Sequence, residues 1–448
     1  MSGVVGIYGQ ERVASKLFYG LSSLQHRGQE GAGMTVSNGE ELKRVKSKGL
    51  VMEVFSEEKL MDLAGSLGIG HVRYSTGGAF HEYNCEPLMA FARGESISLA
   101  YDGSLINSQI LRTRLEEEGM MFQTTNDAEV ILYLITRYYQ GNIVEAIQKT
   151  ASLIKGSYCV VLLLKDQLVA FRDHHGIRPL VLGQDEEGYI IASENAPIDI
   201  MGGEVLRDVQ PGEILLIDQE GVQSYFMKEE AQERNCVFEY VYFARNDATL
   251  DGVNAYMFRR RTGEILWQEK PVEADLVIPV PDSGVPSAMG YAQESGIPLA
   301  EGLVKNRYVG RSFIKPTAKE REMSVKLKLN PLSHVVEGKD IVLLDDSIVR
   351  GTTSKNLIHR LKKAGARKVH LRVTSPPIAN PCYYGIDTPS RSNLIAAQYK
   401  IEEIEEMIGA DSLAFISLEG FEKAARKSLS KMCLACFNGD YPVDPVII

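Results

Sequence analysis

The amino-acid sequence predicts two domains in series, a layered α+β domain over residues 1–230 and an α/β domain with a doubly wound parallel sheet over residues 231–448. A length of 448 residues with 44% hydrophobic content suits two or three domains with sizeable cores. The polar run at residues 227–235 lacks an apolar period and is typical of a linker. After it, apolar strands alternate with helices, as in doubly wound sheets. These strands are expected at residues 276–280, 341–344 and 368–373.

The first half mixes strands and helices at short spacing, which indicates a layered α+β domain. Its strands are rich in β-branched, aromatic or aliphatic residues. Asn126 and Asp127 can cap a helix that presents Val130, Ile131, Leu134 and Ile135 on one face and ends at Gly141. The other elements expected here are strands at residues 4–8, 158–164 and 168–171 and a helix at about residues 13–24.

The composition restricts the class of protein. No apolar run approaches the roughly 18 residues that a membrane span requires, and the N-terminus lacks a basic region followed by an apolar signal core. We therefore expect a cytoplasmic protein. The net charge of -10 argues against a general nucleic-acid-binding role.

The sign of the charge reverses between Lys305 and Lys328. Eight Lys or Arg residues stand there against Glu320 and Glu322, so that the segment carries a net charge of +6. Such a segment is either a solvated charged loop or a basic lid that closes over an anionic ligand.

Residues 341–354, Ile-Val-Leu-Leu-Asp-Asp-Ser-Ile-Val-Arg-Gly-Thr-Thr-Ser, have the pattern of a phosphate and sugar site. The apolar run suits a strand covered on both faces, and Asp345 and Asp346 follow at its carboxyl end, where open α/β sheets bind ligands. Paired carboxylates there can hold ribose hydroxyls or Mg²⁺. Gly351 lets the backbone approach an anion, and hydroxyl side chains join the free amides at the start of a helix. The alternative is an ordinary strand, acidic turn and helix.

This segment resembles the binding signature for phosphoribosyl pyrophosphate (PRPP) of type I phosphoribosyltransferases. With its neighbours it is similar, over nearly the whole chain, to the glutamine PRPP amidotransferase family. The supporting runs are Val-Pro-Asp-Ser-Gly at 280–284, Lys-Asn-Arg-Tyr-Val-Gly-Arg at 305–311, Lys-Leu-Lys-Leu-Asn-Pro at 326–331 and Ser-Pro-Pro at 375–377. The resemblance implies an N-terminal-nucleophile (class II glutamine amidotransferase) layered sandwich of the α+β class, followed by an α/β type I phosphoribosyltransferase domain.

The resemblance also implies a reaction, in which PRPP and ammonia give 5-phosphoribosylamine and pyrophosphate at the first step of purine (IMP) biosynthesis. Ser283, Asp345 and Asp346 would hold Mg²⁺ or the ribose. The 5'-phosphate would be bound by Ser347, Ile348, Val349, Arg350, Gly351, Thr352 and Thr353. Pyrophosphate would meet Lys305, Arg307, Lys326 and Lys328, within a basic lid. Family members oligomerise and bind purine nucleotides, so we expect a homodimer or homotetramer with AMP and GMP as feedback ligands.

Six cysteines in a cytosolic chain do not suggest a disulfide framework. Cys433 and Cys436 form a C-x-x-C pair, which can bind metal, act in redox chemistry or be structural. Some members of the resembled family hold a four-iron four-sulfur (4Fe-4S) cluster with cysteines in the contexts of Cys236, Cys382, Cys433 and Cys436. We therefore expect a structural cluster that pins the C-terminal tail, with zinc as the alternative. Cys85 and Cys159 have the pattern of ordinary thiols.

The first half resembles the glutaminase domain of the same family in the runs His-Arg-Gly-Gln-Glu at 26–30 and His-Val-Arg-Tyr-Ser-Thr at 71–76. By that resemblance, Arg73 would bind the carboxylate of glutamine, a bidentate task that suits guanidinium. Asp127 would bind the α-ammonium group of glutamine, and Gly103 would supply an amide to an oxyanion hole.

Two positions depart from the family. Mature chains of the family begin with a nucleophilic cysteine, whereas this chain has Ser2 at that position. The family forms its oxyanion hole with an Asn-Gly pair, and this chain has Asp102-Gly103 in its place. An ionised carboxylate cannot donate a hydrogen bond, and losing one oxyanion donor costs about 10²- to 10³-fold in turnover. We expect a weak or inactive glutaminase. Ser2 itself has three explanations: a paralogue with a decayed glutaminase, an engineered nucleophile-to-serine variant, or a genuine serine amidase.

Two other functions are compatible with the sequence. One is a non-catalytic sensor of PRPP or purine nucleotides, which would bind PRPP without releasing pyrophosphate. The other is phosphoribosyl transfer to an amine other than ammonia.

Overall fold

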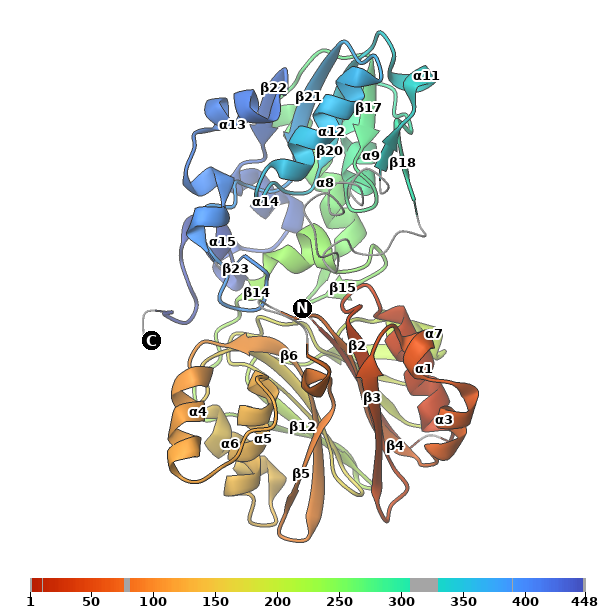
Figure 1. Cartoon of the computed structure of the whole chain (residues 1–448), viewed down its shortest axis with the longest axis vertical. Coiled ribbons are helices and arrows are strands. Elements are labelled where there is room, and N and C mark those ends of the chain that lie inside the picture. The colour runs from red at the N-terminus through yellow and green to blue at the C-terminus, as the bar shows by residue number, and fades with distance from the viewer. Residues whose placement is uncertain (1, 10, 76–80, 307–328, 389, 446–448) are drawn as a thin grey trace.

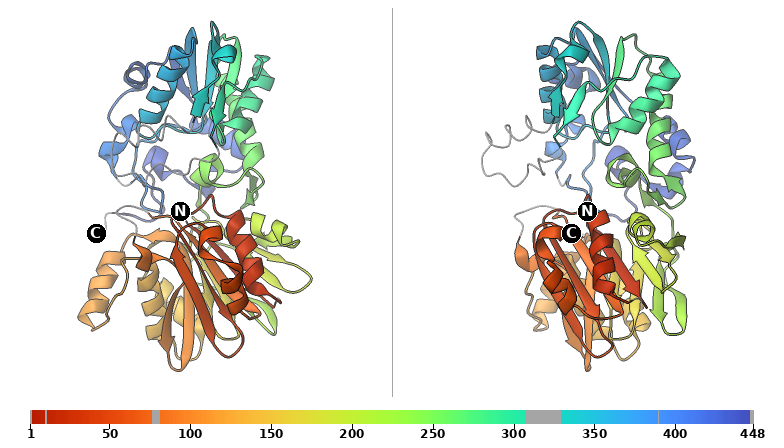
Figure 2. Two further views of the ribbon diagram at one scale, coloured as in Figure 1. Left: turned by 45° about the vertical axis from the view of Figure 1, so that its right-hand side comes forward. Right: turned by 90° about the vertical axis from the view of Figure 1, so that its right-hand side faces the viewer.

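The computed structural model describes all residues except 1, 10, 76–80, 307–328, 389 and 446–448. Figures 1 and 2 show two halves stacked along the long axis of the molecule. Among the described helices, none is long and apolar enough to cross a membrane.

The N-terminal half is built on two antiparallel sheets, the seven-stranded sheet and the six-stranded sheet. The first has the order β11 (Glu204–Asp208), β9 (Val181–Gln184), β10 (Tyr189–Ala192), β1 (Gly3–Tyr8), β4 (Leu67–Arg73), β2 (Gly31–Ser37) and β3 (Leu42–Lys48). The second has the order β13 (Gly221–Phe226), β12 (Glu213–Asp218), β8 (Leu168–Arg172), β7 (Gly156–Leu163), β6 (Glu95–Leu105) and β5 (Leu88–Ala92).

The two sheets lie face to face, with helices on both outer faces (Figure 1). One core, which includes Val4, Ile69 and Val161, fills the space between the sheets. Helix α1 (Val13–Ser23) packs on the seven-stranded sheet together with α2 (Val51–Val54), while α7 (Ala196–Ile200) packs on α1. The six-stranded sheet is covered by α4 (Ser108–Glu117), α5 (Asp127–Tyr138) and α6 (Ile143–Ala151). The half is therefore the layered α+β domain that the sequence predicts.

Helix α5 shows how the local sequence determines where a helix begins and which face it buries. The Asn126 side chain accepts the amide hydrogen of Ala128, so that the helix begins where the capping pattern predicts. The predicted apolar face is buried against the six-stranded sheet. The predicted end at Gly141 is too late, because the helix ends at Tyr138 and Tyr139 is already extended. A separate helix, α6, follows from Ile143.

The C-terminal half is built on a parallel sheet of four strands in the order β17 (Leu276–Pro279), β20 (Asp340–Asp345), β21 (Lys368–Val373) and β22 (Ser412–Phe415). Helices α8 (Ala255–Glu269) and α9 (Gly284–Ser295) contact one face, while α12 (Thr352–Lys363) and α13 (Ile401–Ile408) contact the other. Helices on both faces are the doubly wound arrangement that the sequence predicts. It did not predict β22.

The two halves share a hydrophobic core, which includes Ile177 and Ile190 from the first half and Val237 and Phe258 from the second. The polar run at residues 227–235 connects β13 to the short strand β14 (Asn235–Cys236). Strand β14 pairs in parallel with β23 (Met432–Cys433), so the C-terminal segment returns to the junction of the halves.

Candidate active sites and the cysteine cavity

The first candidate site lies at the carboxyl end of β20, where Asp345 and Asp346 are both buried. Asp346 accepts hydrogen bonds from the hydroxyls of Ser283 and, at 2.5 Å, Ser347. Burial raises the pKa of Asp345, and the neighbouring Asp346 raises it further. Burial also raises the pKa of Asp346, against the lowering effect of the two serine hydroxyls. Two adjacent buried acids without a cation are costly, so this geometry suits a metal ion or ligand hydroxyls.

The turn after these aspartates leads into the N-terminus of α12. Gly351 precedes the helix with φ 73°, and a Cβ atom there would lie 2.8 Å from Ile395 Cδ1. The positive φ favours glycine here, and any side chain would also have to displace the end of the Ile395 side chain. The amide of Ile395 donates to the carbonyl of Val349 at 2.9 Å and holds the turn in place. No side chain caps the helix, so its first amides remain available to an anion.

Ser283 reaches Asp346 because its segment lies against β20. A Cβ atom on Gly284 would approach the carbonyl oxygen of Leu344 to 2.7 Å, so the close contact needs glycine. Lys305, at the end of β18 (Leu303–Lys305), forms an ion pair with Asp282 at the start of the same segment. The structure thus gathers Ser283, Asp345, Asp346 and the turn 347–353, while Lys305 pairs with a neighbour of Ser283. Arg307, Lys326 and Lys328, with the basic lid, lie outside the described residues.

The second candidate site surrounds Ser2, which is buried at the start of β1. Its amide donates to Asp102 Oδ1 at 2.7 Å, and its carbonyl accepts from Arg27 Nε at 2.9 Å. Its hydroxyl oxygen accepts the amide hydrogen of Tyr74 at 3.2 Å. Pairing of β1 with β4 sets Gly3 opposite Val72 and so brings Ser2 beside Arg73.

Asp102 on β6 acts as an acceptor in this site. Burial by itself would raise its pKa, but Arg178, Arg27 and the amide of Ser2 outweigh burial and lower it. Asp102 is therefore ionised at neutral pH and has no proton to donate. Gly103 follows with φ 155°, and a Cβ atom there would lie 2.1 Å from the carbonyl oxygen of Ser157, so only glycine fits.

A buried network of charges joins this site to the C-terminal half, and sequence patterns did not predict it. Arg27 Nη1 contacts Glu194 at 2.7 Å, and Arg27 Nη2 contacts Glu239 at 2.8 Å and Asp102 at 3.5 Å. Arg178 lies 3.5 Å from Glu239 and donates to the carbonyl of Tyr384. The cationic partners lower the pKa of Glu194 to about 2, despite its burial. Glu239 and Tyr384 belong to the C-terminal half, so the network crosses between the halves.

Arg73 and Asp127, the predicted contacts for an amino acid, both lie near this site, but each already has an internal partner. Arg73 Nη1 lies 3.2 Å from Glu86 Oε1. Asp127 Oδ2 accepts the amide hydrogen of Leu105 at 2.9 Å, and burial raises its pKa. Sequence reasoning missed Glu86, because no local pattern showed that a glutamate in this loop would be buried.

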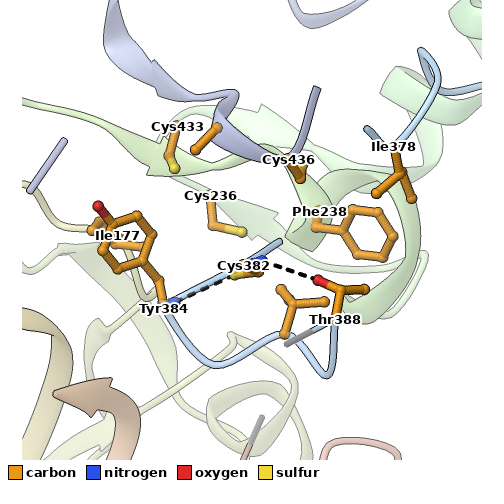
Figure 3. A pocket seen from close by; sticks show the side chains of 11 residues that line it. Ile177, Cys236, Phe238, Ile378, Cys382, Tyr384, Thr388, Cys433 and Cys436 are labelled. Carbon is orange, nitrogen blue, oxygen red and sulfur yellow. Dashed lines mark hydrogen bonds between the residues drawn. The ribbon is translucent and has the colours of Figure 1, made fainter. Parts of the chain in front are cut away.

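The four cysteines expected to act as ligands line one cavity (Figure 3). Cys236 and Cys433 are opposite each other in the β14–β23 pair, and Cys436 lies on α15 (Ala435–Asn438). The Sγ atom of Cys382 accepts the amide hydrogen of Tyr384 at 3.3 Å. Burial raises the pKa of Cys236 to about 12 and raises the pKa values of Cys433 and Cys436, as do charges on neighbouring thiols.

The cysteine side chains are not arranged around a single ion. Across the described part of the chain, no group of three or more His, Cys, Asp or Glu side chains is placed to hold a single metal ion. All six cysteines are free, and Cys85 and Cys159 do not line the cavity. Four thiols around one apolar cavity are compatible with a group larger than one ion, because soft thiolates are the usual ligands of iron-sulfur clusters.

Comparisons with known proteins match both domains. A glutamine amidotransferase domain model matches residues 71–199, and a phosphoribosyl transferase domain model matches residues 245–385. The chain is 47% identical over 447 residues to the amidophosphoribosyltransferase of Methanothermobacter thermautotrophicus, covering 98% of this chain and 94% of that protein. It is 44% identical over 447 residues to the Bacillus subtilis enzyme of the same name, covering 99% and 94%.

A solved structure shares the whole fold. The glutamine PRPP amidotransferase of B. subtilis, complexed with ADP and GMP, matches with a TM-score of 0.93 and 44% identity over 99% of this chain and 98% of that chain. Both expected fold classes, the N-terminal glutamine amidotransferase domain and the following phosphoribosyltransferase domain, are therefore confirmed. On these similarities, the chain belongs to the amidophosphoribosyltransferase family.

Proposed function

We propose that the chain transfers the phosphoribosyl group of PRPP to ammonia, giving 5-phosphoribosylamine and pyrophosphate, as the first step of purine biosynthesis. The observation that carries this proposal is the pair of buried acids at the end of β20, next to the uncapped N-terminus of α12. A sugar phosphate with vicinal hydroxyls needs such a combination, because the helix amides bind the phosphate and the carboxylates bind hydroxyls or a metal ion.

The residues of this site have separate tasks in the proposed reaction. Asp345, Asp346 and Ser283 hold the ribose or Mg²⁺, and the turn 347–353 positions the 5'-phosphate. Bound Mg²⁺ would supply positive charge to the pyrophosphate. Lys305, with Arg307, Lys326 and Lys328, stabilises the negative charge that develops on the leaving group. The transition state is oxocarbenium-like, so positioning and charge stabilisation suffice without a side-chain nucleophile.

The glutaminase site of the chain is proposed to be weak or inactive. Three observations support this, namely Ser2 at the nucleophile position, an ionised Asp102 where a donor is needed, and an Arg73 that already faces Glu86. Ammonia would then come from free ammonium or from another protein.

A single assay tests the proposal. The full chain is given PRPP and Mg²⁺ with either ammonium or glutamine, and pyrophosphate release is measured. We expect release with ammonium and much slower release with glutamine. Equal rates would contradict the glutaminase claim. PRPP binding without pyrophosphate release with any amine would instead establish a sensor, and release only with a different amine would change the acceptor.

The cysteine cavity is proposed to hold a 4Fe-4S cluster with a structural role. Burial raises the pKa values of Cys236, Cys433 and Cys436, so thiolates at these positions need a cationic group to stabilise them. Anaerobically purified protein should contain iron and sulfide and absorb in the visible blue. Zinc without sulfide would instead assign the cavity to zinc.

The remaining expectations are proposals too. We propose a domain boundary at residues 230/231, between β13 and β14, a cytoplasmic location, and a homodimer or homotetramer. Purine nucleotides such as AMP and GMP are proposed as feedback ligands, because a relative with the same fold is complexed with ADP and GMP. Sedimentation and calorimetric titration with these nucleotides would test the last two proposals.

A further inference from the structure

Arg73, the proposed anchor for an amino-acid carboxylate, is not a free cation. Its Nη1 lies 3.2 Å from Glu86 Oε1, and the two side chains are only 12% and 1% exposed. A pair this buried interacts more strongly than a surface pair, because little water screens the two charges.

The position of Glu86 is fixed by further hydrogen bonds. Its Oε2 accepts the amide hydrogen of Tyr101 at 2.8 Å, and its Oε1 accepts from the Asn126 side chain at 2.6 Å. These donors come from β6 and from the residue that caps α5. The Glu86 carboxylate is therefore held in position by the fold, beside Arg73.

The other titratable groups around Glu86 do not replace it as the partner of Arg73. On β4, His71 Nε2 lies 3.8 Å from Glu86 and 3.0 Å from the carbonyl oxygen of Tyr101, to which it donates. Burial lowers the pKa of His71 to about 3, so that it is neutral. On β3, Lys46 donates to the carbonyl of Cys85 at 2.5 Å and acts on Glu86 only at longer range. The charge of Arg73 also acts on Asp127 of α5, but Asp127 accepts its hydrogen bond from the amide of Leu105.

This geometry makes an incoming carboxylate compete with Glu86. A ligand carboxylate bound to Arg73 would lie beside the Glu86 carboxylate, and two adjacent carboxylates do not both remain ionised at low cost. The repulsion between the two carboxylates is removed when Glu86 takes up a proton. Burial raises the pKa of Glu86 to about 7, so this proton is available near neutral pH.

We propose that Glu86 sets the ligand selectivity of the N-terminal site, by excluding ligands with a free α-carboxylate unless a proton is bound with them. The inference rests on the proposed role of Arg73 in that site. Amines that carry a carboxamide but no carboxylate escape this exclusion. By linkage, affinity for an amino acid is constant below about pH 7 and falls by up to about tenfold per pH unit above it.

Calorimetric titration of the full chain with L-glutamine tests the proposal at pH 6, 7 and 8, each in two buffers of different ionisation enthalpy. We expect weaker binding at pH 8 than at pH 6 by about tenfold, with up to one proton taken up per glutamine. A matched ligand, 4-aminobutanamide, lacks the carboxylate and should bind without proton uptake. Glutamine binding that is independent of pH and takes up no proton would overturn the proposal.

The variant Glu86→Gln should bind glutamine more tightly than the natural chain at pH 8 and lose the pH dependence. The control Glu82→Gln alters an exposed glutamate of the same loop, which pairs with Ser47, and should behave as the natural chain. If Glu86→Gln does not fold, the number of protons that the natural chain takes up per bound glutamine still tests the proposal. Absence of glutamine binding in the natural chain and in a folded Glu86→Gln variant at every pH would overturn the inference. Ammonium-dependent pyrophosphate release, measured on the same samples, tests the transferase separately.

Discussion

The acid pair of the transferase site and Asp102 of the N-terminal site are both buried, but their surroundings differ. Among the described residues, no cation forms an ion pair with Asp345 or Asp346, and burial raises the pKa values of both. Asp102 lies beside Arg27 and Arg178, which lower its pKa, whereas burial raises the pKa of Glu86 although Glu86 is paired with Arg73. Buried acids that no cation neutralises destabilise the fold and are retained for a ligand, whereas two guanidinium groups of the protein stabilise the charge of Asp102. We therefore expect the acids of the transferase site to bind a ligand or a cation.

The largest expected effect comes from the double variant Asp345→Asn/Asp346→Asn. Ammonium-dependent pyrophosphate release should fall about 10³-fold, because the contacts to ribose or Mg²⁺ are lost. The melting temperature should rise, since the cost of two unpaired buried acids is removed. The control Asp340→Asn lies at the other end of β20 and should retain activity. A double variant that is active and less stable would contradict the comparison.

Breaking the charge network should cost stability. Arg27→Ala leaves Glu194, Glu239 and Asp102 without their shared cation, so the free energy of unfolding in urea should fall by about 3 to 5 kcal/mol. Arg367→Ala removes an exposed guanidinium that pairs with Asp340, and it should lower the free energy of unfolding far less. If both variants lost the same free energy of unfolding, the charge network would contribute no more to stability than a surface ion pair.

Restoring the expected chemistry at the N-terminal site should produce a smaller gain. The double variant Ser2→Cys/Asp102→Asn regains a stronger nucleophile and an amide donor, so glutamine-dependent pyrophosphate release should rise about 10²-fold. Each single variant should gain less. The ratio of glutamine- to ammonium-dependent rates measures the effect, and an unchanged ratio would mean that other residues limit the site.

A last effect concerns the pH dependence of stability. The pKa of Glu86 is raised from 4.5 to about 7 in the folded chain, so its favourable contribution is complete below pH 4.5 and is lost as pH rises to about 7. Relative to Glu86→Gln, the natural chain should lose on the order of 3 kcal/mol across this window. Urea unfolding at pH 4.5, 6 and 8 measures the difference. A natural chain that becomes more stable than Glu86→Gln as the pH rises would contradict the raised pKa of Glu86.

The sequence predicted those parts of the molecule that depend on neighbouring residues. The strand, carboxylates and glycine turn at residues 341–354 are local, and the structure places them as β20 and the start of α12. The cavity of four cysteines came from a family resemblance, since its members are up to 200 residues apart (Cys236 to Cys436). Arg27 meets Glu239 across 212 residues, and Glu86 meets Arg73 only because a loop is buried against β4. Such pairs carry no local periodicity, so a single sequence does not show them.

The ion pair between Arg27 and Glu239 has a consequence for dividing the protein into parts. A fragment ending at residue 230 would keep Arg27 and Arg178 but lose Glu239 and the carbonyl of Tyr384. Two guanidinium groups would then stand at a newly exposed apolar surface with fewer partners. Chimaeras that exchange either half with a relative should therefore carry these contacts across together, or the swapped proteins will be insoluble.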